Sequence, residues 1–186
     1  GNYVFRTDAL IARLREDAGI DESKHDFGRD VLPMMVRRGD RVFAYDFRTN
    51  HVPGEVDNSY WRDIGTIDAY FDAQMDLVSI KPLFNFYNRH WPIRTRISHD
   101  PPAKFVFRDE AQSRVGVATE SIVSMGCIIS GGSVKRSILS PNVRVHSFSD
   151  VEDSLLFEGV EVGRYAKVKN AIIDKNAKIM PNATVG

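Results

Sequence analysis

The residue best placed to do chemistry is Asp63, in the segment Tyr60-Trp61-Arg62-Asp63-Ile64-Gly65-Thr66. A glycine follows it two residues later, and the pattern from Thr66 onward predicts the start of a helix. A carboxylate in that place is exposed beside backbone N–H groups that attract phosphate, and it can hold Mg²⁺ together with substrate phosphate oxygens. The alternative is that Asp63 pairs with Arg62 or caps the following turn, and spacing alone leaves both interpretations open.

The elements that would position this segment are predicted to be α/β over residues 1 to about 90. An apolar stripe predicts a helix after the N-cap Thr66, formed by Ile67, Tyr70, Phe71, Met75 and Val78. Two earlier helices are predicted, one capped by Thr7 or Asp8 and closing near Gly19, the other starting at Asp26 or Asp30 and stopping at Gly39. Residues 2–5 and 41–47 have apolar or alternating patterns that predict strands.

The last third of the chain repeats every 17 residues, which predicts a parallel β-helix built from hexapeptides. Aliphatic residues recur at three positions, six, five and six residues apart, so each coil would have three short faces around one interior. The three columns are Ile128, Val145, Val162 and Ile179; Val134, Val151, Val168 and Val185; and Leu139, Leu156 and Ile173. A small residue stands four after each member of the first column, as a tight corner requires: Gly132, Ser149, Ala166 and Ala183.

Charged residues 17 apart would stack at parallel-strand spacing and mostly alternate in sign, which predicts solvent-exposed ladders rather than binding sites. The predicted ladders are Lys135, Glu152 and Lys169; Arg144, Glu161 and Lys178; Arg136 over Asp153; Asp150 over Lys167; and Glu158 over Lys175. Arg164 is the exception because its stacked neighbours are Ser147 and Pro181. It is therefore the candidate in the coils for binding an effector phosphate.

Composition excludes several classes of function. The 25 basic residues balance 25 acidic ones, so no excess charge favours nucleic acid or an anionic membrane. No apolar run approaches about 18 residues and no signal peptide opens the sequence, so we expect no membrane partner and a cytoplasmic protein. The single cysteine, Cys127, has no cysteine partner for a disulfide or a zinc site and is expected to be a small buried residue.

Both ends of the sequence look cut, since Gly1 leads directly into an apolar segment and Gly186 stops early in a new face. We therefore expect a fragment of a longer protein. Its predicted domains are residues 1–90, the C-terminal part of an α/β domain; residues 91–115, a proline-containing connector; and residues 116–186, a truncated β-helix.

The chain resembles the bacterial glucose-1-phosphate adenylyltransferases over essentially its whole length. The resemblance rests on Tyr60 to Thr66 and on three further segments: His25-Asp26-Phe27-Gly28, Asn88-Arg89-His90-Trp91-Pro92-Ile93-Arg94-Thr95, and Pro101-Pro102-Ala103-Lys104-Phe105-Val106. It implies a Rossmann-like nucleotidyltransferase domain followed by a left-handed parallel β-helix. It also implies a homotetramer, with ATP and glucose 1-phosphate as substrates, ADP-glucose and pyrophosphate as products, and a place in glycogen synthesis.

The resemblance also implies roles for individual residues. Asp63 would lie at the metal and sugar-phosphate end of the cleft, and Mg²⁺ would be the cofactor. Tyr3, Asp26, Phe27 and Trp61 would line or support the glucose pocket, although each aromatic residue could equally be plain core. The solenoid would serve subunit contact and control by phosphorylated metabolites.

Some parts of the family pattern have no match in these residues: the Gly-rich phosphate loop, the catalytic arginine and lysine, a second metal-site aspartate and a Glu-Lys pair. The isolated fragment is therefore expected to be inactive. A non-catalytic regulatory or assembly subunit of the same family is the stronger alternative. A hexapeptide acyltransferase is the weaker alternative. It would need a catalytic histidine, and the sole histidine of the coils, His146, follows Val145, where a surface or already paired histidine is expected. The α/β part of the chain would also have no role in such an enzyme.

Overall fold

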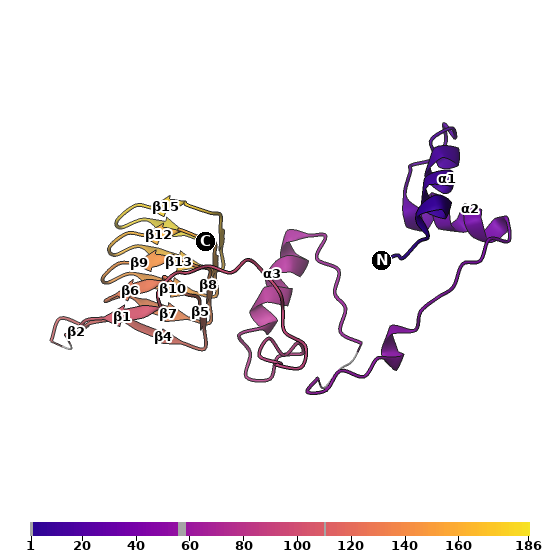
Figure 1. The fold of residues 1–186 in the computed structure, drawn as a ribbon. Helices are drawn as coiled ribbons and strands as arrows, with labels where there is room; N and C mark the ends of the chain where they lie inside the picture. The colour runs from indigo at the N-terminus through magenta and orange to yellow at the C-terminus, as the bar shows by residue number, and fades with distance from the viewer. Residues whose placement is uncertain (1, 56–58, 110) are drawn as a thin grey trace. The chain divides into compact units, whose positions relative to one another are not determined.

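The computed structural model describes residues 2–55, 59–109 and 111–186 (Figure 1). By its contacts the chain divides into two compact units, Gly1–Phe47 and Arg48–Gly186. The domain boundaries predicted from the sequence, near residues 90 and 115, remain a prediction.

The first unit is helical. Helix α1 (Thr7–Asp17) starts after Arg6, which makes no side-chain capping bond, so the predicted cap by Thr7 or Asp8 is wrong; Asp8 lies in the first turn instead. A π-helical turn, η1 (Phe27–Val31), leads into α2 (Leu32–Arg37). Asp26 caps η1 as predicted, because its side chain accepts a hydrogen bond from the Arg29 N–H at 2.8 Å. Gly39 follows α2 with a φ of 78°, the left-handed conformation typical of a helix stop.

The two predicted strands of this unit do not form. Residues 2–5 are irregular, and residues 41–46 are irregular up to a short 3₁₀ turn, η2 (Phe47–Thr49). An alternating pattern gives only a half-buried surface, and a strand also needs a neighbouring strand for its backbone N–H and C=O groups. Tyr45 and Phe43 are 74% and 84% exposed, so these two rings lie largely at the surface of the unit.

The second unit contains helix α3 (Ile67–Asp76) and the solenoid. Thr66 is the N-cap of α3 as predicted, since its Oγ1 accepts a hydrogen bond from the Ala69 N–H at 3.1 Å. Ala73 is buried on this helix, whereas Ile67, at its start, is 77% exposed.

The solenoid has three parallel sheets, one for each face of the coil, which Figure 1 shows as stacked turns. The first sheet joins β1 (Lys104–Val106), β6 (Ile128–Ser130), β9 (Arg144–Val145), β12 (Glu161–Val162) and β15 (Lys178–Ile179). The second joins β4 (Val117–Thr119), β7 (Ser133–Lys135), β10 (Asp150–Glu152), β13 (Lys167–Lys169) and β16 (Thr184–Val185). The third joins β5 (Ile122–Val123), β8 (Ile138–Leu139), β11 (Leu155–Leu156) and β14 (Ile172–Ile173). A short antiparallel hairpin, β2 (Arg108–Asp109) with β3 (Arg114–Val115), interrupts the first coil. The predicted parallel β-helix is confirmed.

Two of the three predicted columns are confirmed residue by residue, but the first is displaced at its start. Val145 pairs with Ile129, not with Ile128, and Ile129 is fully buried while Ile128 is half-buried. The corner that follows is one residue shorter than in later coils and contains Gly131, at a φ of 73°, and Gly132. A β-carbon on Gly132 would lie 2.6 Å from the carbonyl oxygen of His146, so only glycine fits this tight corner.

A ladder of serines stabilises the corner between the second and third sheets. Ser121, Ser137 and Ser154 stack one coil above another, and each hydroxyl accepts the backbone N–H of the next coil at 3.1 to 3.2 Å. Each also donates to the carbonyl two residues earlier, at 2.7 Å. The ladder ends at Ala171, whose backbone N–H donates to Ser154, so the buried hydroxyls of Ser137 and Ser154 each donate and accept a hydrogen bond.

Candidate functional site

Three of the predicted sugar-pocket residues lie together in the first unit. The ring centroids of Tyr3 and Phe27 are 5.6 Å apart, and Phe5 joins them at 6.3 and 5.7 Å. Tyr3 is 43% exposed and Phe27 is half-buried, so the rings form an accessible cluster rather than closed core. The carboxylate of Asp26 lies beside this cluster, because a β-carbon on Gly28 would lie 3.3 Å from Asp26 Oδ1 and 3.6 Å from the Tyr3 hydroxyl.

The other two predicted residues belong to the second unit, in the turn that precedes α3. Asp63 is exposed, and its Oδ1 accepts a hydrogen bond from the Gly65 N–H at 3.1 Å. The turn-capping role that the sequence left open is therefore present. Trp61 is 59% exposed, and the guanidinium of Arg62 lies 5.9 Å from the centroid of the Tyr60 ring rather than on Asp63.

The environment of Asp63 fits a partial metal site. Its second carboxylate oxygen makes no hydrogen bond within the described ranges, and it faces solvent before the first turn of α3. No group of three His, Cys, Asp or Glu side chains among the described residues is placed to hold a metal ion by itself. The resemblance seen in the sequence implies a divalent metal ion at Asp63. One carboxylate together with substrate phosphate oxygens is a common arrangement for such an ion.

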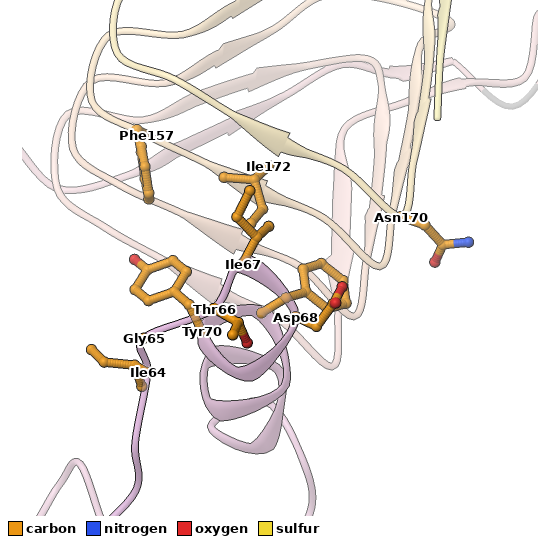
Figure 2. Close-up of a pocket in the computed structure, with 10 residues that line it drawn as sticks. Ile64, Gly65, Thr66, Ile67, Asp68, Tyr70, Phe157, Asn170 and Ile172 are labelled. Carbon is orange, nitrogen blue, oxygen red and sulfur yellow. The ribbon is translucent and has the colours of Figure 1, made fainter.

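An open groove of about 890 Å³ lies between the start of α3 and the third sheet of the solenoid (Figure 2). Ile64, Gly65 and Thr66 line it from the turn that carries Asp63, and Phe157, Asn170 and Ile172 line it from the coils. The rings of Tyr70 and Phe157 meet edge to face across it, with centroids 6.4 Å apart. The helix that follows the candidate metal turn therefore contacts the solenoid through these two rings.

The contact depends on a second aliphatic column, which the sequence analysis missed. Ile122, Ile138, Leu155 and Ile172 pair in register along the third sheet and alternate with the core column, so they face out of the coil. Leu155 is nevertheless only 2% exposed. The signal was present in the sequence, because both residues of every strand on this face are aliphatic, where a solvent-facing strand would alternate with polar residues.

The charge ladders behave as predicted where ion pairs form. Lys169 and Glu152 pair at 3.0 Å, and Arg136 binds Asp153 through two nitrogens at 2.7 Å. The Arg136 guanidinium holds the pKa of Asp153 below its usual range, and the same contacts raise the pKa of Arg136. These bonds join neighbouring coils and provide no cavity for a ligand.

Two residues of the coils were singled out for other roles. The imidazole Nε2 of His146 lies 2.7 Å from a carboxylate oxygen of Glu161, and this contact lowers the pKa of the Glu161 carboxyl. A histidine already paired in this way is not placed as a free catalytic base. Arg164 is exposed on its corner, and no ion pair to its guanidinium occurs within the described ranges.

Comparisons with known proteins confirm the predicted fold class, a nucleotidyltransferase α/β domain followed by a β-helix. A family model for nucleotidyl transferases matches residues 1–80, and a model for the GlmU-like C-terminal hexapeptide region matches residues 101–186. None of the helices in the described part of the chain has the length and hydropathy that a membrane crossing needs.

Curated glucose-1-phosphate adenylyltransferases are similar over the whole chain. The one from Anaeromyxobacter sp. (strain Fw109-5) is 52% identical over 188 residues, and the one from Parafrankia sp. (strain EAN1pec) is 55% identical over 189. The one from Bifidobacterium adolescentis is 51% identical over 188 residues. All of this chain is covered in each case, and it spans 45 to 46% of the length of these relatives. Since this identity extends through both matched regions, the chain belongs to the glucose-1-phosphate adenylyltransferase family.

Proposed function

We propose that this chain is part of an enzyme that converts ATP and glucose 1-phosphate to ADP-glucose and pyrophosphate, the committed step of glycogen synthesis. The observation that carries the proposal is the identity of 48 to 55% to curated enzymes of that name over the entire chain. Two features of the described residues support it: an accessible aromatic cluster with a carboxylate in the first unit, and an exposed carboxylate before a helix in the second.

In the proposed reaction an oxygen of the sugar phosphate attacks the α-phosphorus of ATP, so the protein mainly orients reactants and neutralises charge. Tyr3, Phe27 and Trp61 would offer aromatic faces to the sugar, and Asp26 would accept hydrogen bonds from its hydroxyls. Asp63 would hold Mg²⁺, which supplies charge neutralisation at the phosphates. The Gly65 N–H fixes the rotamer of Asp63 at 3.1 Å, so one oxygen stays directed away from the turn.

The test is the formation of ADP-glucose from ATP, glucose 1-phosphate and Mg²⁺ by the complete protein of which this chain would be a part. We expect Asp63→Asn to lower kcat by at least about 100-fold, because the variant loses the charge that holds the metal. Asp72→Asn is the matched control: it removes an exposed carboxylate from α3, away from the turn, and should change kcat less than about twofold. Full activity of Asp63→Asn would contradict the assigned role.

The same assay separates the proposal from its main alternative. If the complete protein binds other subunits of the family or metabolites but forms no ADP-glucose, it is a regulatory or assembly subunit. We also expect the 186 residues by themselves to be inactive.

Control by phosphorylated metabolites is the second part of the proposal, with Arg164 as the phosphate ligand in the coils. An exposed guanidinium without an ion-pair partner is free to bind a phosphate through two N–H groups. Arg164→Ala should raise the effector concentration for half-maximal response by about tenfold, whereas Lys175→Ala, which removes another exposed cation of the coils, should not. An unchanged response in Arg164→Ala would remove the idea.

The remaining parts are assembly and location. We propose a cytoplasmic homotetramer without nucleic-acid or membrane partners. Domain boundaries near residues 90 and 115 complete the proposal. Light scattering of the complete protein tests the tetramer, and limited proteolysis tests the boundaries.

A further inference from the structure

A buried carboxylate at the end of α1 ties down the loop that leads to the proposed sugar pocket. Asp17 is only 3% exposed. Its Oδ1 accepts a hydrogen bond from the Ser23 hydroxyl at 2.7 Å, and its Oδ2 lies 2.8 Å from Nδ1 of His25. The Ser23 hydroxyl oxygen in turn accepts the backbone N–H of His25 at 3.0 Å. Both oxygens of Asp17 are thus used to hold the loop of residues 18–25.

The protonation states in this network follow from the same contacts. The hydrogen bond from Ser23, and after it the one from His25, hold the pKa of Asp17 below its usual range, so the group is a carboxylate at neutral pH. A carboxylate only accepts hydrogen bonds, so Nδ1 of His25 carries the proton. The imidazole side chain is 59% exposed, and its position is set from one side by Asp17.

The backbone at His25 explains why the loop needs to be held. His25 has a φ of 57°, the left-handed conformation that a side chain with a β-carbon rarely adopts. The next residue, Asp26, caps η1, and Phe27 is the first residue of that turn. The direction in which both residues point is therefore set by the turn at His25, and that turn is held by the two bonds that reach it from Ser23 and Asp17.

We propose that Asp17 is a positioning residue for the glucose 1-phosphate pocket, acting through His25 and Ser23 to hold the left-handed turn that presents Asp26 and Phe27. The inference rests on the function proposed above. Asp17 itself makes no contact with substrate in this proposal. It holds Asp26 and the Phe27 ring in the orientation that the sugar meets.

The test is steady-state kinetics of the complete protein carrying Asp17→Ala or His25→Ala. Each should raise KM for glucose 1-phosphate by about tenfold and leave KM for ATP within about twofold, because the loss falls on the sugar side of the site. His25→Ala keeps the test valid if Asp17→Ala fails to fold, because it replaces a largely exposed side chain. Asp8→Asn is the control on the same helix: its carboxylate is exposed and pairs with Arg6 at 3.0 Å, and its loss should change neither KM.

A rescue variant separates positioning from general stability. Asparagine tolerates the left-handed conformation, and its side-chain amide can donate to Asp17 in the place of Nδ1. His25→Asn should therefore keep KM for glucose 1-phosphate within about threefold of the wild-type value. If His25→Asn is as impaired as His25→Ala, or if Asp17→Ala lowers the melting temperature without changing KM, the positioning role is wrong. Wild-type protein that forms no ADP-glucose would overturn the proposed function and this inference with it, whereas active wild-type protein with an unchanged Asp17→Ala overturns the inference alone.

Discussion

Replacement of Leu155 by alanine tests whether α3 is docked on the outer face of the coils. Leu155 precedes the core residue Leu156 on a two-residue strand, so its side chain points outward, yet it is only 2% exposed. Its neighbour in the outer column is Ile172, which lines the groove together with α3. We therefore expect the segment that contains α3 to cover Leu155 as well.

The expected magnitude follows from that burial. Truncation of a buried leucine to alanine costs about 2 to 5 kcal/mol, and the cost is lowest where the surroundings can relax. Because the open groove at the neighbouring Ile172 allows relaxation, we expect about 2 kcal/mol, which is about a 30-fold change in an equilibrium constant. The same change on a solvent-exposed face would cost less than about 0.5 kcal/mol.

Hydrogen exchange of the backbone amides measures the effect where it should occur. The helical amides of α3, such as that of Tyr70, should exchange about 30-fold faster in Leu155→Ala, because the variant weakens the contact that closes the helix onto the coils. Leu156→Ala is the control on the same strand, since Leu156 is fully buried inside the coil. It should speed exchange in the coils more than in α3. The reasoning is refuted if Leu155→Ala leaves α3 unchanged and affects only the coils, as Leu156→Ala does.

Three further predictions concern the solenoid. Ser154→Ala removes the acceptor of the Ala171 N–H and should lower the free energy of unfolding by about 1 to 3 kcal/mol in urea denaturation; an unchanged midpoint would contradict the ladder. Since Arg136 lowers the folded pKa of Asp153, the pair contributes stability that is present above the unfolded pKa of about 4 and is lost as the pH falls through the folded value. In Arg136→Met the urea midpoint of unfolding should therefore fall less steeply with pH below about pH 4 than in the wild type. An equal dependence of the midpoint on pH in both proteins would refute this. Burial raises the pKa of the Cys127 thiol, which is 1% exposed, so a maleimide should label it at least about 100-fold more slowly in native than in urea-unfolded protein, and comparable rates would contradict its burial.

The solenoid could be predicted from sequence because its contacts are periodic. Each strand pairs with the strand one coil away, so the spacing of Val134, Val151 and Val168 alone gives their register. The error at Ile128 arose where the period changes: the corner after Ile129 is one residue shorter, and a fixed period of 17 cannot register a deletion inside a coil. The pair Gly131-Gly132 was the available sign of that shorter corner.

The first unit was harder to predict because its patterns depend on distant partners. Helix α1 and the cap by Asp26 rest on hydrogen bonds within four residues, and both could be predicted within a residue or two. The alternation over residues 41–47 was equally clear in the sequence, but a strand forms only where another strand pairs with it, and no local pattern supplies that partner. The Asp17 network was missed for a related reason, since its three residues lie six and eight apart, a spacing that no helix or strand period singles out.

The outer column of the third sheet is a periodic pattern that also points to a contact with a distant part of the chain. A hexapeptide coil needs one inward aliphatic residue on each face, and Leu139, Leu156 and Ile173 meet that need. The coil itself does not need the second aliphatic residue of each strand. Its presence in every strand of this face therefore indicates that the face is covered. On the other side of the groove, Gly65 and Thr66 join α3 to Asp63. A shift of α3 on the coils would therefore also move the turn proposed to hold the metal. The rings of Tyr70 and Phe157 therefore connect the coils with the segment that carries the turn proposed to hold the metal.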